Sequence, residues 1–383
     1  MTFFPDFFRA RKEVRRFHQL EASFRNIVFY AEDAPSTVHF EGIIEELTGP
    51  LKQKICYLTS SSDDPILNTK NPNILPFYIG EGMQRTSLFM NLKANVFVMT
   101  MPDLETFHIK RSKVFSVHYV YIFHSIVSTH LIYRKAAFDH FDTIFCVGPH
   151  HLKEIRETES VYGLKAKNLV EHGYGRLDTL IAELELSSPS PKEGKKHVLI
   201  APSWGKNCLL ETLGKEIVEV LLNAGFHVTV RPHPFTIKKW PEAIQGIREK
   251  FQSCQDFILE TDIRSKDSLQ AADLMISDWS GAAFEYTLTF GKPVLFIDVP
   301  KKINNPEYDK ISCIPIEVSM RKQLGRVVAP DQIEKIPGKI GSLLSGGNDF
   351  HQRLQEVREF TVFNLGKSGK VGAEEIVKIA GSQ

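Results

Sequence analysis

The segment around Arg231 and His233 has the residue types needed for phosphate binding or proton transfer. An apolar run, residues 226–230, ends at Arg231, and Pro232 and Pro234 restrict the backbone on both sides of His233. An arginine can hold a phosphate through paired hydrogen bonds, and a histidine can change its charge near neutral pH. A structural turn with a histidine on the surface is the alternative interpretation.

A second candidate site begins where another apolar run ends, at Ser277 and Asp278. Ser280 and Gly281 stand at the start of the helix that we expect next. The free N–H groups of a helix N-terminus bind anions, and the Ser280 hydroxyl adds a hydrogen-bond donor. We therefore expect a phosphate site here, with Glu285 accepting hydrogen bonds from a ribose. Ser and Asp are also common helix caps, so a capped helix without a ligand remains an alternative.

A third candidate follows the apolar run 197–201, in a small polar loop that contains Ser203 and Lys206. The loop leads into an expected helix. Lys206 and the helix start could together hold a phosphate. Simple capping of the helix would explain the same residues.

His124 follows an apolar run and is our candidate for a proton acceptor. A lone histidine in this position is more often a core residue. His118 and His130 flank it, but their spacing of six residues from His124 is not a zinc-binding pattern. No cluster of carboxylates indicates a metal either, so we expect no metal site.

Apolar runs alternate with helix-length segments, which places these candidates at the ends of strands. Near-continuous apolar strands separated by helices are typical of parallel sheets that helices cover on both faces. The clearest helix is expected at 209–223, with Gly225 as its stop. The expected strands are 26–30, 54–58, 95–99, 114–122, 143–147, 168–171, 197–201, 226–230, 256–259, 273–277 and 293–297.

A segment rich in Ser, Pro, Gly and Lys, residues 187–196, divides this series and is the expected linker. We predict an α/β fold of two doubly wound, Rossmann-like domains, at 23–186 and at 197–383, the second including the C-terminal helices. Ligands of such folds bind outside the carboxyl ends of the strands, so a site is expected in the cleft between the domains. Gly173 and Arg176 are expected in a loop on the hinge side of this cleft.

The composition is that of an ordinary globular protein. Its 383 residues suggest two or three domains, and 42% hydrophobic residues exclude a largely disordered chain. The net charge of +1 excludes the basic field of a dedicated nucleic-acid binder, so we expect no nucleic-acid partner. The five cysteines form no Cys-x-x-Cys motif and suit the reducing cytosol, so we expect a cytoplasmic protein.

The first 22 residues are aromatic and then basic, and we expect them to form a helix. They lack the long apolar region of a secretory signal. Such a helix could lie on anionic lipid at the inner face of the cell membrane, or it could dock its Phe side chains on the domain. Residues 114–133 contain no Asp, Glu, Lys or Arg, but their histidines and hydroxyls indicate a strand and loop rather than a transmembrane helix.

Taken together, these motifs resemble the CDP-glycerol glycerophosphotransferase family, the teichoic-acid primases and polymerases with a two-domain GT-B fold. The order of the motifs carries the resemblance as much as their letters. A histidine follows a strand, and Gly-Tyr-x-Arg-x-Asp, Ala-Pro-x-Trp, Arg-Pro-His-Pro and an Asp-x-Ser stretch with an aromatic–acidic pair come after it. In this chain they stand at His124, 173–178, 201–204, 231–234 and 277–285.

Four positions depart from the family pattern. Ser125 and Ile126 stand where the family has Gly and Thr, Gly281 replaces a Ser that contacts phosphate in the family, and Glu285 replaces Asp. These departures leave open whether the donor is CDP-glycerol, CDP-ribitol or another nucleotide-activated group.

The resemblance implies transfer of a glycerol-phosphate or related polyol-phosphate unit from a CDP-activated donor to a glycan or lipid-linked acceptor. CMP would be released, in the synthesis of bacterial teichoic acid or capsule. In this reaction His124 would take the proton of the acceptor hydroxyl. Arg231 and His233, with the loop at Ser280 and Gly281, would stabilise the charge on the departing CMP. The nucleotide is a substrate, and no cofactor is expected.

Three other functions fit the same features. The first is a GT-B glycosyltransferase that uses a CMP- or UDP-sugar for capsule or lipopolysaccharide. The second is a nucleotide-sugar 2-epimerase, which would leave the N-terminal helix without a role. The third is a non-catalytic, nucleotide-binding scaffold at a membrane surface. Nucleotide release measured over a panel of donors separates them.

Overall fold

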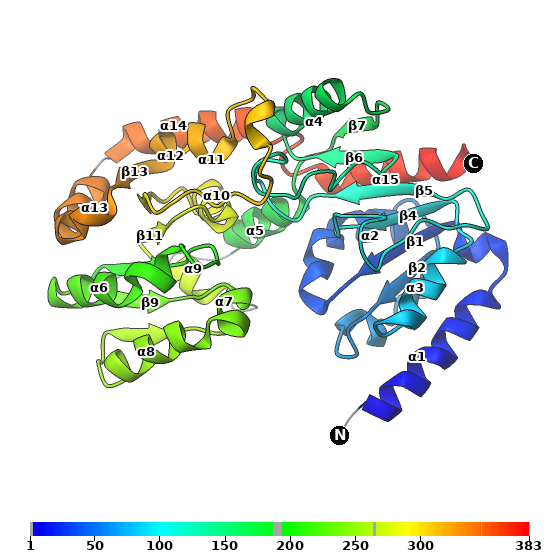
Figure 1. Ribbon diagram of the computed structural model, residues 1–383, viewed down its shortest axis with the longest axis horizontal. Helices are drawn as coiled ribbons and strands as arrows, with labels where there is room; N and C mark the ends of the chain where they lie inside the picture. The colour runs from blue at the N-terminus through cyan, green and yellow to red at the C-terminus, as the bar shows by residue number, and fades with distance from the viewer. Residues whose placement is uncertain (1–2, 187–193, 263–265, 346, 383) are drawn as a thin grey trace.

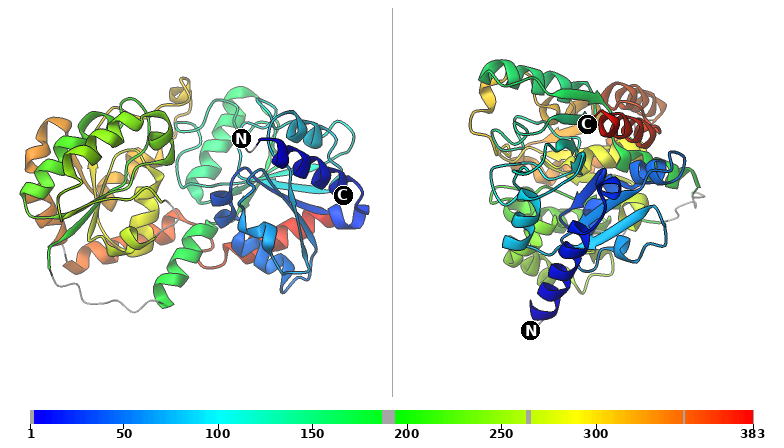
Figure 2. Two further views of the ribbon diagram at one scale, coloured as in Figure 1. Left: turned by 90° about the horizontal axis from the view of Figure 1, so that it is seen from below. Right: turned by 90° about the vertical axis from the view of Figure 1, so that its right-hand side faces the viewer.

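Two parallel β-sheets, side by side, form the frame of the computed structural model (Figures 1 and 2). The structure describes residues 3–186, 194–262, 266–345 and 347–382. All strand pairs within these residues are parallel. The predicted α/β class with two doubly wound sheets is therefore confirmed.

The first sheet contains seven strands in the order β3-β2-β1-β4-β5-β6-β7. The strand order reverses between β1 and β4, which makes the carboxyl ends of these strands the expected place for a ligand. The strands are β1 Ile27–Ala31, β2 Ile55–Thr59, β3 Ile74–Tyr78, β4 Val96–Met99, β5 His118–Ile122, β6 Thr143–Cys146 and β7 Asn168–Glu171.

The second sheet contains six strands in the order β10-β9-β8-β11-β12-β13. Its order reverses between β8 and β11, so a second expected ligand position lies at the carboxyl ends of those two strands. The strands are β8 His197–Ile200, β9 His227–Val230, β10 Phe257–Leu259, β11 Leu274–Ser277, β12 Val294–Ile297 and β13 Gly325–Val328.

Helices connect the strands and pack on the sheets (Figure 1). Those of the first half are α1 Phe3–His18, α2 Glu41–Thr48, α3 Met83–Met90, α4 Pro149–Tyr162 and α5 Gly175–Leu186. Those that follow are α6 Leu209–Asn223, α7 Pro234–Lys239, α8 Pro241–Phe251, α9 Asp267–Ala271, α10 Gly281–Phe290, α11 Ile316–Ser319, α12 Arg321–Leu324, α13 Ile336–Leu344, α14 Gly347–Thr361 and α15 Ser368–Gly381. Helix α6 has the bounds that its apolar pattern predicted.

The expected strands are present within one residue of their predicted bounds, except that β5 begins later than its apolar run, at His118. The sequence pattern missed β3 and β13, which are both edge strands. β3 contains Pro76, which lacks an N–H group and is tolerated because only β2 pairs with this strand. A proline inside an apolar run argues against a strand unless the edge position is known.

The C-terminal helices do not all belong to the second sheet, which corrects the predicted domain at 197–383. Helix α15 packs against α2, and its residues Ala373 and Ile376 share an apolar cluster with Ile27 and Phe29 of β1. The reason is that a parallel sheet needs a cover on both faces, and α15 completes the cover on one face of the first sheet. Most of the expected linker, residues 187–193, lies outside the described residues, so the domain boundary stays a prediction.

The crossing of α2 and α15 depends on two glycines. A Cβ atom on Gly369 would lie 2.8 Å from the carbonyl carbon and oxygen of Gly42, which is closer than real Cβ contacts. Backbone cannot move aside as a side chain can, so the two helices can approach this closely only without a side chain at position 369.

We predict that Gly369→Ala destabilises the protein by about 1–3 kcal/mol, because the added methyl group overpacks this crossing. The midpoint of urea unfolding measures the effect. Gly341→Ala is the matched control, since this glycine is also inside a helix but its Cβ position is open. An equal response of the two variants would contradict the account.

Candidate active site

His124 follows β5 and is oriented by the backbone of the neighbouring strand. Its Nδ1 lies 3.1 Å from the carbonyl oxygen of Thr100, which follows β4. Because a carbonyl oxygen only accepts hydrogen bonds, Nδ1 carries the hydrogen and Nε2 is the basic nitrogen. Burial lowers the pKa of His124, so the ring is neutral at neutral pH. A neutral ring with a basic Nε2 is the form that a general base requires.

His39 and Tyr174 lie beside this histidine. The ring centres of His39 and His124 are 6.2 Å apart, and those of His39 and Tyr174 are 5.9 Å apart. Burial lowers the pKa of His39 well below its usual value, so this ring is also neutral. The sequence analysis missed His39, because it ends the short helix η2 (Ala34–His39) and does not follow a strand. Only the fold brings it next to His124.

Glu285 of α10 links the second sheet to the first. Its Oε1 accepts a hydrogen bond of 2.6 Å from the Tyr174 hydroxyl, and its Oε2 lies 3.0 Å from Nε of Arg176. The Tyr174 hydroxyl is also 3.0 Å from the carbonyl oxygen of His124. Glu285 therefore holds Tyr174 and Arg176 in place, and both of its oxygens have protein partners. The ribose contact expected of Glu285 stays a prediction, and it would need one of these contacts to change.

The N-terminus of α10 lies directly against the residue that follows His124. A Cβ atom on Gly281 would be 2.2 Å from Oγ of Ser125, so the two positions share one space. Two departures from the family pattern, Ser125 and Gly281, thus face each other. The contact also brings the candidate base and the candidate phosphate loop together, although they are far apart in the sequence.

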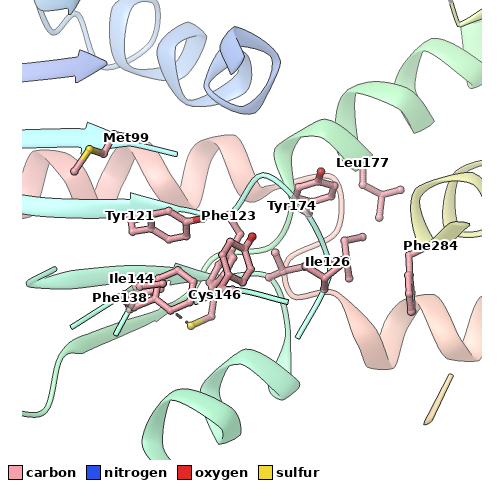
Figure 3. Packing of buried hydrophobic residues seen from close by; sticks show 14 of the residues in the cluster. Met99, Tyr121, Phe123, Ile126, Phe138, Ile144, Cys146, Tyr174, Leu177 and Phe284 are labelled. Carbon is pink, nitrogen blue, oxygen red and sulfur yellow. Dashed lines mark hydrogen bonds between the residues drawn. The ribbon is translucent and has the colours of Figure 1, made fainter. Parts of the chain in front are cut away.

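Apolar side chains on both sides surround this contact. Figure 3 shows Phe284 of α10 facing Ile126, Tyr174 and Leu177, and all four belong to one buried cluster. The cluster continues to Phe123, next to His124. The loop that carries the candidate base is therefore packed against a helix of the second sheet.

Ser277 and Asp278 were expected at the donor site, and in the structure both side chains are hydrogen-bonded to backbone groups of the protein. Both side chains are buried, and the Ser277 hydroxyl donates a hydrogen bond to the carbonyl oxygen of Ala201. The Asp278 carboxylate accepts hydrogen bonds from the N–H groups of Ser203 and Leu209, at 2.7 and 3.0 Å. Buried polar groups need partners, and here the backbone after β8 and the start of α6 provide them. Both side chains therefore hold the loop in shape, and the donor contact expected of them stays a prediction that would need these hydrogen bonds to change.

The other residues of these loops differ in their surroundings. The Ser203 hydroxyl is buried and lies 3.2 Å from Sγ of Cys208, whereas Lys206 is exposed. Ser280 caps α10, because its hydroxyl oxygen accepts a hydrogen bond from the N–H of Ala282. This is the capping role that the sequence analysis left open.

Arg231 was expected to hold a phosphate, but its guanidinium forms an ion pair inside the protein. Nη1 lies 2.9 Å from Oε2 of Glu260, which follows β10, and 3.3 Å from Oγ of Ser268. The side chain is only 11% exposed. The physical reason is that a nearly buried cation needs a counter-charge, and the neighbouring strand end provides one.

His233 lies in an aromatic group with Trp204, Phe235 and Trp240. Its Nδ1 accepts a hydrogen bond from the N–H of Phe235 and so caps α7. Because Nδ1 accepts, Nε2 carries the hydrogen of the neutral ring. Burial and the nearby charge of Lys302 lower the pKa of His233 to about 4, so the ring is neutral at neutral pH. A neutral Nε2–H group can donate a hydrogen bond to a phosphate oxygen.

Lys302 is the second functional candidate that the sequence analysis missed. It follows β12, and its Nζ lies 3.9 Å from the ring centre of Trp204. A signal was available, because a basic pair, Lys301 and Lys302, follows the apolar run of β12. Within the part of the chain that the structure describes, no group of three or more His, Cys, Asp or Glu side chains could hold a metal ion.

Comparisons with known proteins show the family of the chain. The family model described as CDP-Glycerol:Poly(glycerophosphate) glycerophosphotransferase matches residues 89–302, more than half of the chain. The chain belongs to this family and is a transferase. No curated protein matches the sequence.

Solved structures with the same fold share little sequence with the chain. A variant of the wall teichoic acid polymerase TagF has a TM-score of 0.62 at 14% identity, over 98% of this chain and 94% of that one. The UDP-GlcNAc 2-epimerase of Methanocaldococcus jannaschii, in complex with UDP-GlcNAc and UDP, gives 0.56 at 15% identity, over 94% and 99%. A glycosyltransferase of Rickettsia africae gives 0.51 at 12%, over 93% and 98%. These similarities confirm the predicted GT-B fold.

We predict that Gly281→Ser lowers activity and stability, because the new side chain displaces the Ser125 hydroxyl. Ser125→Gly in the same chain should recover much of the loss, since it vacates the shared space. The coupling between the two changes is expected to be about 0.5–3 kcal/mol, measured as a double-mutant cycle on the unfolding midpoint and on CMP release. Simple additivity of the two single changes would refute the shared space.

Proposed function

We propose that the protein transfers a glycerol-phosphate or related polyol-phosphate unit from a CDP-activated donor to a glycan or lipid-linked acceptor. The product belongs to a bacterial cell-surface polymer, teichoic acid or capsule, and CMP is released. Membership of the glycerophosphotransferase family supports the donor class. The observation that carries the proposal is the contact between Ser125 and Gly281, which brings the candidate base His124 to the candidate phosphate loop.

The tautomers of His124 and His233 decide which role each histidine has in the proposed reaction. The acceptor hydroxyl oxygen forms a bond to the β-phosphorus of the donor, and its proton passes to Nε2 of His124. The bond between this phosphorus and the bridging oxygen of the diphosphate breaks, and CMP leaves. Its new negative charge is met by Nε2–H of His233 and by the N-terminus of α10. No step needs a cofactor.

We predict that His124→Ala and His233→Ala each lower kcat by about a hundredfold or more, since general-base and charge-stabilising roles have such magnitudes. CMP release from CDP-glycerol and CDP-ribitol with a lipid-linked acceptor measures the rate. His118→Ala is the control, because His118 lies at the start of β5, at the opposite end of the strand from His124, and contacts Thr143.

The acid limb of kcat/KM is a further test of His124. Its pKa is lowered by burial, so activity should persist below the ordinary imidazole value of about 6.5 and fall only at more acidic pH.

Release of nucleotide from a CMP- or UDP-sugar, with none from any CDP-polyol, would instead support a glycosyltransferase.

We also propose that α1 attaches the enzyme to the inner face of the cell membrane. One side of α1 packs on the body: Phe17 is buried, and Arg16 lies over the ring of Phe77. Phe7 and Phe8 are 52% and 62% exposed. Figures 1 and 2 show the N-terminal end of α1 extending beyond the first sheet. Within the described residues, no helix is long and apolar enough to cross a membrane.

The basic side chains of α1 support this orientation. Arg11 and Lys12 are exposed one turn after Phe7 and Phe8, and Arg15 is exposed in the last turn, so the helix offers both apolar rings and positive charge to the solvent. This is the composition of helices that lie in the interface of an anionic bilayer.

Binding to vesicles of phosphatidylglycerol and phosphatidylcholine tests the role of α1. We predict that replacing both Phe7 and Phe8 by Ser weakens co-sedimentation about tenfold or more, because burying one such ring in the bilayer contributes about 1.5–3 kcal/mol. Phe360→Ser is the matched control, since Phe360 is 74% exposed on α14. Equal binding by the α1 variant and the control would exclude α1 as the attachment.

A further inference from the structure

Lys302 reaches across the carboxyl end of β11. It follows β12, yet its Nζ lies over Trp204, which follows β8, and β11 is the strand between β8 and β12. The strand order of the second sheet reverses between β8 and β11. Ligands of open α/β sheets bind at this position, outside the carboxyl ends of the strands. The Lys302 ammonium is therefore placed where a ligand of the second sheet would lie.

Trp204 holds the ammonium in this position. Its ring packs on Phe235 with the centres 4.8 Å apart, and Nζ of Lys302 lies 3.9 Å from the centre of the Trp204 ring. A cation over an aromatic face is attracted by the ring and keeps its N–H groups free to donate hydrogen bonds. His233, whose Nε2 carries a hydrogen, belongs to the same aromatic group.

The acidic groups near Lys302 do not form an ion pair with it. Among the described residues, no carboxylate oxygen lies within 4.0 Å of its Nζ, although Asp278 and Glu211 are near enough to act on it electrostatically. Both oxygens of Asp278 accept hydrogen bonds from backbone N–H groups, and Oε1 of Glu211 accepts one from the Thr236 hydroxyl. Arg231, in contrast, is paired with Glu260.

We propose that Lys302, together with Nε2–H of His233, binds the diphosphate of the nucleotide donor at the carboxyl ends of β8, β9 and β11. This inference rests on the proposed function and assigns the phosphate contact to Lys302 in place of Arg231. The ammonium donates hydrogen bonds to the phosphate oxygens and counters the charge that develops on CMP.

The position of Lys302 also connects donor binding to the loop of the candidate base. Two residues later, the N–H of Asn304 donates to the carbonyl oxygen of Leu131, and its Nδ2 donates to that of Ile132, at 3.0 and 2.7 Å. This loop begins at His124. A donor held by Lys302 therefore lies against a segment that is hydrogen-bonded to the loop that carries the base.

Calorimetric titration with CDP and with cytidine tests the contact without requiring turnover. We expect Lys302→Met to weaken CDP binding about tenfold or more, because a charge-assisted hydrogen bond is lost, and to leave cytidine binding unchanged. Lys302→Arg keeps the positive charge and should retain most of the CDP affinity. Lys301→Met is the control, since Lys301 is the exposed neighbour.

The pH dependence of CDP binding distinguishes a phosphate contact from a structural role. Burial lowers the pKa of Lys302 to about 8, so the wild-type protein should lose CDP affinity as the pH rises above about 8. Two other groups near Lys302 titrate outside this range, because burial raises the pKa of Cys208 to about 11 and lowers that of His233 to about 4. The acidic groups near Lys302 are Asp278 and Glu211. In Lys302→Arg the affinity should stay constant over this range.

The outcomes separate this inference from the proposed function. Two results would overturn the role of Lys302 and leave the proposed function intact. The first is that Lys302→Met binds CDP as tightly as the wild-type protein does. The second is that Lys302→Arg also loses CDP affinity above about pH 8. A wild-type protein that binds neither CDP nor CDP-glycerol would overturn the proposed function and this contact together. If Lys302→Met does not fold, the pH dependence of CDP binding in Lys302→Arg decides whether Lys302 contacts the diphosphate.

Discussion

The close approach of α10 to the loop after β5 is the contact on which the candidate site depends. A Cβ atom on Gly281, the first residue of α10, would lie 2.2 Å from Oγ of Ser125, so side chains at these two positions compete for one space. One turn later, Glu285 reaches Tyr174 and Arg176 of the first half. Since α10 follows a strand of the second sheet and Ser125 follows one of the first, this contact sets the position of His124 relative to the candidate phosphate loop.

Buried carboxylates hold the loops around this contact. Asp278 binds two backbone N–H groups after β8 and at α6, Glu317 of α11 binds that of Ser128, and Glu154 of α4 binds that of Thr129. Glu317 is only 1% exposed, and burial raises its pKa to about 7. A buried carboxylate is costly unless it accepts hydrogen bonds, so these groups favour one loop conformation. The acidic groups of the site are therefore largely structural.

The site residues illustrate how far a strand-end rule can go. The rule located His124, His233 and Ser280, because parallel strands end at one edge and small loops follow them. It also selected Arg231 and Ser277, whose side chains turn to partners inside the protein. It overlooked Lys302 and His39, one on a long segment after β12 and one at the end of a short helix. A strand end specifies where a residue is, but not where its side chain points.

The sequence alone determined the α/β class, the series of parallel strands, the helix at α6 and the family, since these follow from local periodicity and short motifs. Tertiary structure decided what local patterns do not encode. It placed α15 on the first sheet because that face needed a cover. It also allowed β3 to form a strand despite Pro76, because β3 is at the edge of its sheet. It also decided which cations are paired: Arg231 meets Glu260, whereas Lys302 lies over Trp204 with no carboxylate within 4.0 Å among the described residues. The physical reason is that ion pairing and burial depend on neighbours that are distant in the chain.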